Sequence, residues 1–401
     1  MGAYEVFARI YQGIFKLVSP LMPWREPELL EGPGSLERLP SFLAAKGIRR
    51  PLIVTDQGLA KLGVQGPLIA GLETAGLGYA LFDGTVPNPT IKNIEDALAV
   101  YRGRGCDAIV ALGGGSPMDC AKGVGARLAR PRKSIEDMKG LLKVGRPMPP
   151  FVAVPTTAGT GSEATLAAVI SNPDTHEKYP INDHALIPHY AVLDPRLTVG
   201  LPPPITATTG MDALTHAVEA FIGRSNSAET ERDALEAAKI IMADLVDAYK
   251  DGGDLARRGR LMKAAYLAGK AFTRAYVGYV HAVAHTLGGF YGVPHGLANS
   301  VLLPIVLDYY GQAAAPRLAL MAKAAGVAQP DAAPDDAARA FIDRVKAMNR
   351  AMGIPERIEA IREADVPAMV ARALAEANPL YPVPRILGRA ELAELYRLAA
   401  G

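Results

Sequence analysis

The 401-residue chain has few cysteines and almost no net charge. Two cysteines, Cys106 and Cys120, are too few for a disulfide framework in so long a chain, which is typical of a reducing compartment. Its 43 Lys and Arg residues against 41 Asp and Glu residues leave a formal charge of +2, too little to hold a polyanion by charge alone. We therefore expect a cytoplasmic protein whose main partner is not a nucleic acid.

The chain also lacks a long uninterrupted apolar run near its N-terminus, where Glu5, Arg9 and Lys16 interrupt the most apolar stretch. This pattern argues against a signal peptide and against a membrane-inserted helix. The remaining composition, 49% hydrophobic with 40 Gly and 32 Pro, is typical of a folded chain with many short connections. At about 150 residues per domain, the length predicts two or three domains.

Residues 4–18 are expected to form an amphipathic helix with a wide apolar stripe. The stripe comprises Val6, Phe7, Ile10, Tyr11, Ile14, Phe15 and Val18. A helix on a membrane surface would usually carry more Lys and Arg on its polar face. We therefore predict that this helix packs on the body of the protein or on a second subunit, and that the protein is a homodimer or a higher homo-oligomer.

The rest of the chain divides at the triple proline of residues 202–204. Before it, apolar runs typical of buried strands alternate with helical segments, which predicts a doubly wound parallel sheet. The expected strands are 51–55, 79–82, 107–112, 151–154 and 190–193, and the expected helices between them include 62–75 and 91–104. After it, the pattern is helical, as in 234–248, 260–274 and 337–352. The predicted organisation is an N-terminal extension (1–26), an α/β domain (27–200) and an all-α domain (201–401).

Two loops of the α/β domain have the composition of a nucleotide site. Gly113, Gly114 and Gly115 follow a predicted strand, with Ser116 expected as the N-cap of the next helix and Pro117 as its first residue. Backbone N–H groups at such a helix start bind phosphate, although the spacing fits neither G-x-G-x-x-G nor a P-loop. A run of hydroxyls and glycines over 155–165 follows the next strand, where parallel sheets bind ligands. Together the two loops predict a bound nucleotide.

The helical half has the composition of a metal site. Asp212 and His216 are four residues apart, as are His281 and His285, and His295 follows. Residues at this spacing project from one face of a helix. Their neighbours are apolar, and shared coordination would relieve the cost of burying these polar groups. Nitrogen and carboxylate ligands without a thiolate indicate Fe²⁺ or Zn²⁺, and an open coordination position would make the site catalytic.

From about Leu30 to Gly401 the chain resembles the iron-dependent (group III) alcohol dehydrogenases. The resemblance rests on five motifs, at residues 113–122, 155–163, 210–216, 278–285 and 294–296. It implies an N-terminal dinucleotide-binding domain, a helical metal-binding domain and an active site in the cleft between them. The activity it implies is hydride transfer between a small alcohol or aldehyde and NAD, with a metal that polarises the substrate oxygen.

The resemblance also implies roles for single residues. The metal ligands would be Asp212, His216, His281 and His295. The cofactor would be bound by Asp56, Asn88, Gly114, Gly115, Ser116, Thr156, Thr157, Thr160, Thr165 and Lys178. His285 would lie outside the metal ligands, beside the nicotinamide and the substrate, as the catalytic proton relay. An acid at Asp56 would bind the adenosine ribose and repel a 2′-phosphate, which favours NAD over NADP.

Three points stay open. The first is the role of the N-terminal extension, which lies outside the resemblance. The second is the role of Arg274, which replaces a small polar residue and is either a pocket contact or part of a helix-face salt bridge. The third is the class of enzyme. A dehydroquinate-synthase-like or glycerol-dehydrogenase-like enzyme acting on a polyol or phosphorylated substrate, and a non-catalytic or filament-forming relative, are the alternatives. Apolar residues around His281 and His295 favour a small uncharged substrate; they are Tyr279, Val280, Leu287, Phe290, Tyr291 and Val293.

Overall fold

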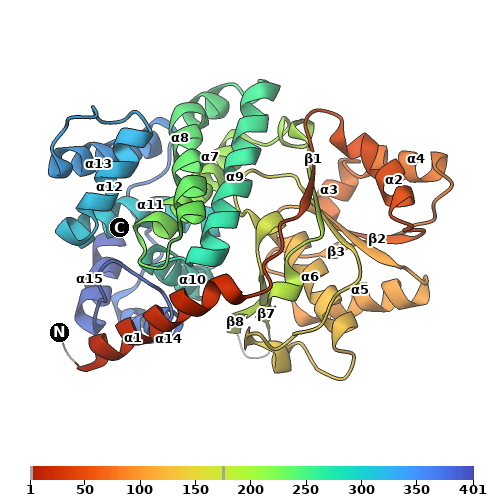
Figure 1. Cartoon of the computed structure of the whole chain (residues 1–401), viewed down its shortest axis with the longest axis horizontal. Coiled ribbons are helices and arrows are strands. Elements are labelled where there is room, and N and C mark those ends of the chain that lie inside the picture. Colours follow the sequence, from red (N-terminus) through yellow and green to blue (C-terminus); the bar gives the residue numbers. More distant parts are fainter. Residues whose placement is uncertain (1–2, 174–176) are drawn as a thin grey trace. The chain divides into compact units, whose positions relative to one another are not determined.

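The computed structural model describes residues 3–173 and 177–401, which form two compact units (Figure 1). The α/β unit comprises Pro23–Gly200 and Asp254–Met262. The helical unit comprises Met1–Met22, Leu201–Gly253 and Lys263–Gly401. The N-terminal extension thus groups with the helical unit.

The α/β unit is built on a six-stranded sheet whose neighbouring strands are all parallel, in the order β1-β9-β6-β4-β2-β3. Its strands are β1 (Glu28–Glu31), β2 (Pro51–Asp56), β3 (Ala80–Thr85), β4 (Ala108–Gly113), β6 (Phe151–Pro155) and β9 (Tyr190–Leu193). The five strands expected from the sequence are all present. The short β1, which pairs with β9, was not predicted.

Both faces of this sheet are buried. Alternate side chains of a strand point to opposite faces, so each strand contributes to two cores. In β2, Leu52 and Val54 belong to one hydrophobic core, to which α5 (Ile91–Gly103) and α6 (Gly115–Ala129) also contribute. The α6 residues in this core include Met118 and Val124. Ile53 lies in the opposite core, formed with α2 (Ser35–Ala45) and α4 (Gly66–Thr74). The short α3 (Gln57–Lys61) follows β2. The predicted doubly wound fold is confirmed.

A second, three-stranded sheet was not predicted. It consists of β5 (Gly140–Leu141), β8 (Glu177–Asn182) and β7 (Ala167–Asn172), in that order. β7 and β8 pair antiparallel, whereas β5 and β8 pair parallel. β5 has only two residues, and β7 and β8 are only partly buried, so these strands lack the continuous apolar runs by which the larger sheet was recognised.

The helical unit is centred on α7 (Pro203–Ile222), which packs against α8 (Ala228–Lys250) and α11 (His295–Tyr310). α10 (Tyr279–Tyr291) packs against α11 and α14 (Val366–Ala377). The residues of α9 (Leu255–Ala275) from Lys263 onward also belong to this unit, and the other helices are α12 (Ala315–Ala324), α13 (Pro334–Ala351) and α15 (Arg389–Ala399). This arrangement brings α7, α10 and α11, the three helices that carry the predicted metal ligands, together in one unit.

The predicted N-terminal helix is present as α1 (Ala3–Val18), followed by the 3-10 turn η1 (Ser19–Leu21). The apolar stripe packs on the body only in part: the Phe15 ring lies edge-on against Tyr276, whereas Phe7, Ile10 and Ile14 are all more than half exposed. Packing of the whole stripe on the body is therefore wrong, and packing on a second subunit stays a prediction. The polar face of α1 points inward instead, with Gln12 only 4% exposed. Among residues 3–173 and 177–401, none of the helices combines the length and hydropathy needed to cross a bilayer.

Candidate metal centre and nucleotide loops

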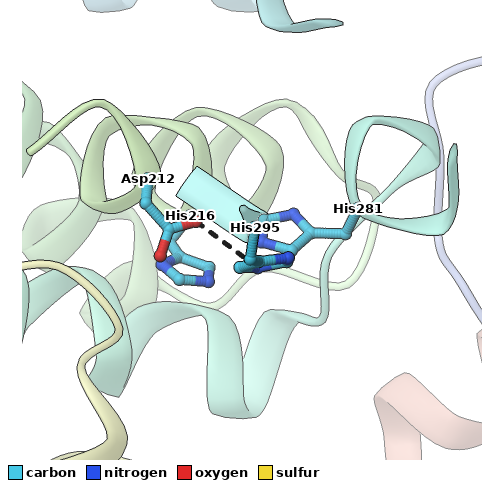
Figure 2. A group of neighbouring side chains, drawn as sticks. All are labelled: Asp212, His216, His281 and His295. Carbon is cyan, nitrogen blue, oxygen red and sulfur yellow. Dashed lines mark ion pairs between the residues drawn. The ribbon is translucent and has the colours of Figure 1, made fainter. Parts of the chain in front are cut away.

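Four side chains of the helical unit converge on one point (Figure 2). Asp212 and His216 project from the same face of α7, His281 comes from α10, and His295 is the first residue of α11. One potential ligand atom from each lies within 4.8 Å of all the others. The first three are buried, whereas the His295 side chain is 32% exposed, so the cluster has one open side.

The donor set fits a divalent cation. Three imidazoles and one carboxylate, without a thiolate, are ligands that suit Fe²⁺ or Zn²⁺. The amide nitrogen of Asn299 lies 2.7 Å from Asp212 Oδ1, 3.2 Å from His281 Nε2 and 3.1 Å from His295 Nε2. These three atoms therefore face one common point. Within the described part of the chain, the buried Asn299 Oδ1 has no hydrogen-bond partner.

A buried carboxylate orients one of the imidazoles. Glu219 Oε2 lies 2.6 Å from His281 Nδ1, and Glu219 Oε1 accepts a hydrogen bond from the Val280 N–H at 2.8 Å. Bonding at Nδ1 leaves Nε2 of His281 to face the cluster, the arrangement typical of metal-bound histidines. Glu219 follows Asp212 and His216 on the same face of α7, and this i, i+4, i+7 spacing was the signal by which the sequence could have identified it.

Electrostatics also favour a cation here. Burial raises the pKa of Glu219 to about 8, against the opposing effect of the N–H groups of Gly278 and Val280. Burial and the neighbouring imidazoles hold the pKa of His281 well below its usual value, so the ring is neutral and can offer a lone pair. A divalent cation beside His281 would favour the ionised form of Glu219.

His285 lies one helical turn beyond His281, beside the four-residue cluster. Its ring stacks on that of His295, with centroids 5.1 Å apart. Its Nδ1 lies 2.7 Å from Oε1 of Glu376 on α14, and the hydroxyl of Tyr381 donates to the same oxygen at 2.8 Å. Sequence reasoning identified neither Glu376 nor Tyr381, because Glu376 lies 91 residues away in the sequence and Tyr381 a further five.

The surroundings of the cluster differ in part from expectation. Tyr279, Val280 and Leu287 were predicted to favour an uncharged substrate, but all three are fully buried core residues, so they carry no information on the substrate. Phe272 instead provides an apolar surface, since its ring stacks on His216 with centroids 4.1 Å apart. Arg274 forms a salt bridge to Glu229 at 2.6 Å, in agreement with the helix-face alternative.

The glycine loop of the α/β unit lies where β4 ends and α6 begins. Gly113 has φ +153°, and a Cβ there would lie 2.5 Å from Pro117, so a side chain is excluded. A Cβ on Gly115 would lie 3.2 Å from Thr160, which shows that the glycine and hydroxyl loops touch. The predicted N-cap is wrong: α6 begins at Gly115, its N-cap is Gly114, and Ser116 lies inside the first turn.

Three predicted cofactor residues gather beside this loop. The Ser116 hydroxyl accepts a hydrogen bond from the Asn88 N–H at 3.2 Å, and Lys178 Nζ donates to the Asn88 side-chain oxygen at 2.8 Å. Asn88 has φ +56°, a left-handed conformation that asparagine tolerates. The backbone and side chain of Asn88 thereby join the glycine loop to β8.

Lys122 holds the hydroxyl loop against α6. Its fully buried Nζ donates to the carbonyl and hydroxyl oxygens of Ser162 and Thr165 and to the carbonyl oxygen of Ala167, at 2.8–3.1 Å. Burial lowers the pKa of Lys122 to about 8. Thr165, predicted to contact the cofactor, thus uses its hydroxyl within the loop. Thr156 is also buried, and its N–H donates to Gly113 O.

Asp56 lies at the carboxyl end of β2, the position expected for a ribose-binding acid. One carboxylate oxygen accepts a hydrogen bond from the Leu59 N–H at 2.9 Å and thereby caps α3. The cap holds the carboxylate at this edge of the sheet.

Comparison with known proteins identifies the family. Residues 27–195 match the family described as iron-containing alcohol dehydrogenase, and residues 206–400 match the C-terminal part of the Fe-containing alcohol dehydrogenase family. Similar proteins include 1,3-propanediol dehydrogenase from Citrobacter freundii, 39% identical over 92% of this chain and 96% of the relative. Lactaldehyde reductase from Escherichia coli K12 is 36% identical over 86% of this chain and 90% of the relative.

Solved structures agree. A crystal structure of 1,3-propanediol oxidoreductase superposes with a TM-score of 0.90 at 38% identity, covering 94% of this chain and 99% of that one. Sulfoacetaldehyde reductase from Bifidobacterium kashiwanohense, solved with NAD⁺, has a TM-score of 0.83 at 28% identity, with coverages of 94% and 99%. The chain belongs to the iron-containing alcohol dehydrogenase family.

The predicted activity is confirmed at the level of the family. The chain is an NAD-dependent, metal-using alcohol dehydrogenase, with NAD and iron as its cofactors. This membership favours the dehydrogenase over the lyase-like and non-catalytic alternatives.

Proposed function

We propose that this enzyme interconverts small uncharged alcohols and their aldehydes, with Asp212, His216, His281 and His295 holding the metal and His285 moving the proton. The convergence of those four side chains within 4.8 Å is the observation that carries the proposal. When bound, the Fe²⁺ or Zn²⁺ supplies Lewis-acid polarisation of the substrate oxygen and lowers the pKa of the alcohol.

The chain's own residues prepare this site. Glu219 holds His281 so that Nε2 faces the cluster, and Asn299 donates to Asp212 Oδ1. The Phe272 ring, stacked on His216, excludes water from that side and presents an apolar surface. An apolar surface of this kind suits a short alcohol better than a carboxylate or phosphate substrate.

His285 is the proton carrier in this proposal. Its Nδ1 is engaged by Glu376, so Nε2 is the nitrogen left to exchange a proton with the substrate oxygen. The Tyr381 hydroxyl donates to the same Glu376 oxygen and so fixes the carboxylate that orients the ring. Imidazole is suited to this task because its ordinary pKa lies near neutrality.

In the α/β unit, we propose that the glycine loop binds the pyrophosphate of NAD through the N-terminus of α6. Gly114, Gly115 and Ser116 provide that helix start. The other predicted contacts are Asp56, Asn88, Thr156, Thr157, Thr160, Thr165 and Lys178.

The location we propose is the cytoplasm, in line with two buried cysteines that form no disulfide.

Two alanine variants test the assignment in the helical unit. His281→Ala should lose both turnover and bound metal, whereas His285→Ala should keep the metal and lose mainly turnover. Metal per chain is measured by mass spectrometry after gel filtration, and turnover by NADH absorbance with short linear alcohols, diols and aldehydes, after reloading with Fe²⁺ or Zn²⁺. Equal metal loss in both variants would contradict the division between ligand and proton carrier.

A further inference from the structure

α1 is an amphipathic helix that turns its polar face inward. Arg9 donates to the carbonyl oxygens of Val383 and Pro384, at 2.7 and 3.0 Å. Gln12 donates to those of Pro379 and Tyr381, at 2.9 and 2.8 Å. These bonds to backbone acceptors fix the rotation of the helix about its own axis. They force the opposite, apolar face outward.

The outward face has the spacing of a helix-packing seam. Phe7, Ile10, Ile14, Leu17 and Leu21 follow one another at intervals of three and four residues, and they are 54, 58, 55, 78 and 84% exposed. Alternation of three and four is the pattern by which one helix packs along another. Tyr4, Val6 and Val18 flank the seam and are also exposed.

The exposed area is large for a monomer. With standard side-chain areas, the seam and its flanks expose on the order of 800 Å² of mainly apolar residues, about what each partner contributes to a standard protein interface. A patch of this size on a soluble protein usually marks an interaction site. The inward hydrogen bonds of Arg9 and Gln12 keep this apolar patch exposed on the outer side of the helix.

We propose that the seam is covered by α1 of a second copy of this chain, packed antiparallel about a two-fold axis at Ile14. Ile14 is the central residue of the seam, so the axis brings it against its own counterpart. A two-fold axis across the helices makes the two copies of α1 antiparallel, and with the axis at Ile14, Phe7 lies beside Leu21 and Ile10 beside Val18 of the second copy, so the seam is covered along its length. The two helix dipoles are also antiparallel, which is favourable.

A lipid surface is a weaker candidate. Helices that lie on membranes carry several Lys and Arg residues on the polar face, free to meet anionic headgroups. In α1 the only basic residues are Arg9 and Lys16, and Arg9 is held by carbonyl oxygens on the inner side. The helix therefore offers lipid almost no electrostatic attraction.

The test compares particle mass by light scattering after gel filtration. The double variant Ile10→Glu/Ile14→Glu should have half the mass of the wild type at the same concentration. Leu320→Glu is the matched control, since Leu320 is 53% exposed on α12, outside the seam, and its variant should keep the wild-type mass. NADH binding by fluorescence shows that each variant is folded.

A cysteine variant tests the geometry independently. Ile14→Cys should form a disulfide-linked pair of chains under mild oxidation, because the two-fold axis places the two thiols together. Cys106 and Cys120 do not compete, since burial raises their pKa values to about 11 and about 12. Equal masses for wild type and double variant, or an Ile14→Cys protein that stays uncrosslinked, would overturn the proposal. Flotation of a monomeric wild type with phosphatidylglycerol vesicles would replace it with the lipid alternative.

Discussion

Replacing Glu219 by Gln exchanges one carboxylate oxygen for an NH₂ group at a buried site and should weaken metal binding. The carboxylate accepts two hydrogen bonds at once, from His281 Nδ1–H through Oε2 and from the Val280 N–H through Oε1. A glutamine of the same shape has only one acceptor oxygen, so its NH₂ group must face either His281 or Val280.

Each orientation has a cost that can be worked out. If the NH₂ faces Val280, two donors oppose each other, and a buried unpaired donor costs about 1–3 kcal/mol. If it faces His281, the ring must accept at Nδ1 and carry its proton on Nε2, the atom that would bind the metal. Loss of such an orienting contact typically weakens metal affinity about 10–100-fold. We therefore expect Glu219→Gln to weaken binding of Fe²⁺ and Zn²⁺ by about that factor.

The assay is competition with a chromogenic chelator, read together with the melting temperature in the presence and absence of Zn²⁺. Glu376→Gln is the matched control, because Glu376 contacts His285, which is not among the four proposed ligands, and this variant should keep the wild-type affinity. Wild-type affinity in Glu219→Gln, or equal weakening in Glu376→Gln, would refute the orienting role.

Two further predictions concern the α/β unit. Asp56→Ser should raise the ratio of kcat/KM for NADP to that for NAD by about tenfold or more, because it removes a charge that repels a 2′-phosphate while serine can still cap α3. A wild type that already prefers NADP would contradict the role given to Asp56. Lys122→Met should destabilise the protein by about 3 kcal/mol or more and weaken NADH binding, because four buried oxygens of Ser162 and Thr165 lose the ammonium whose three N–H donors they share with Ala167 O. Unchanged melting temperature and unchanged NADH affinity by fluorescence titration would show that the loops do not depend on this lysine.

The sequence predicted the parts of the protein that depend on local pattern. The buried run at β4 followed by three glycines placed a loop at the carboxyl end of a strand, and the structure has it there. The i, i+4 spacing of Asp212 and His216 predicted that both lie on one face of a helix, as observed. Both signals lie within a few residues, so no knowledge of the tertiary fold was needed.

What the sequence did not predict depends on contacts between distant segments. Glu219 orients His281 only because α7 and α10 bring residues 62 positions apart together. The sequence failed to predict which face of α1 turns inward for the same reason. Periodicity shows that a helix has an apolar face, but the inward rotation is set by Gln12 and its acceptor Tyr381, 369 positions away. The start of α6 was misplaced because Ser116 is a good N-cap by type, whereas Gly114 takes that position.

The inward face of α1 also connects the extension to His285, the residue that we propose as the proton carrier. Gln12 holds the carbonyl of Tyr381, the Tyr381 hydroxyl holds Glu376, and Glu376 holds the His285 ring. In a shortened protein without α1, the 379–384 segment would lose the hydrogen bonds that Arg9 and Gln12 donate to four of its carbonyl oxygens, while the Arg224 N–H would still donate to Pro382 O, so the segment would open locally more often. Such a protein would be a poor reference for the full-length enzyme, because a drop in its turnover would report a loosened His285 as well as a lost helix.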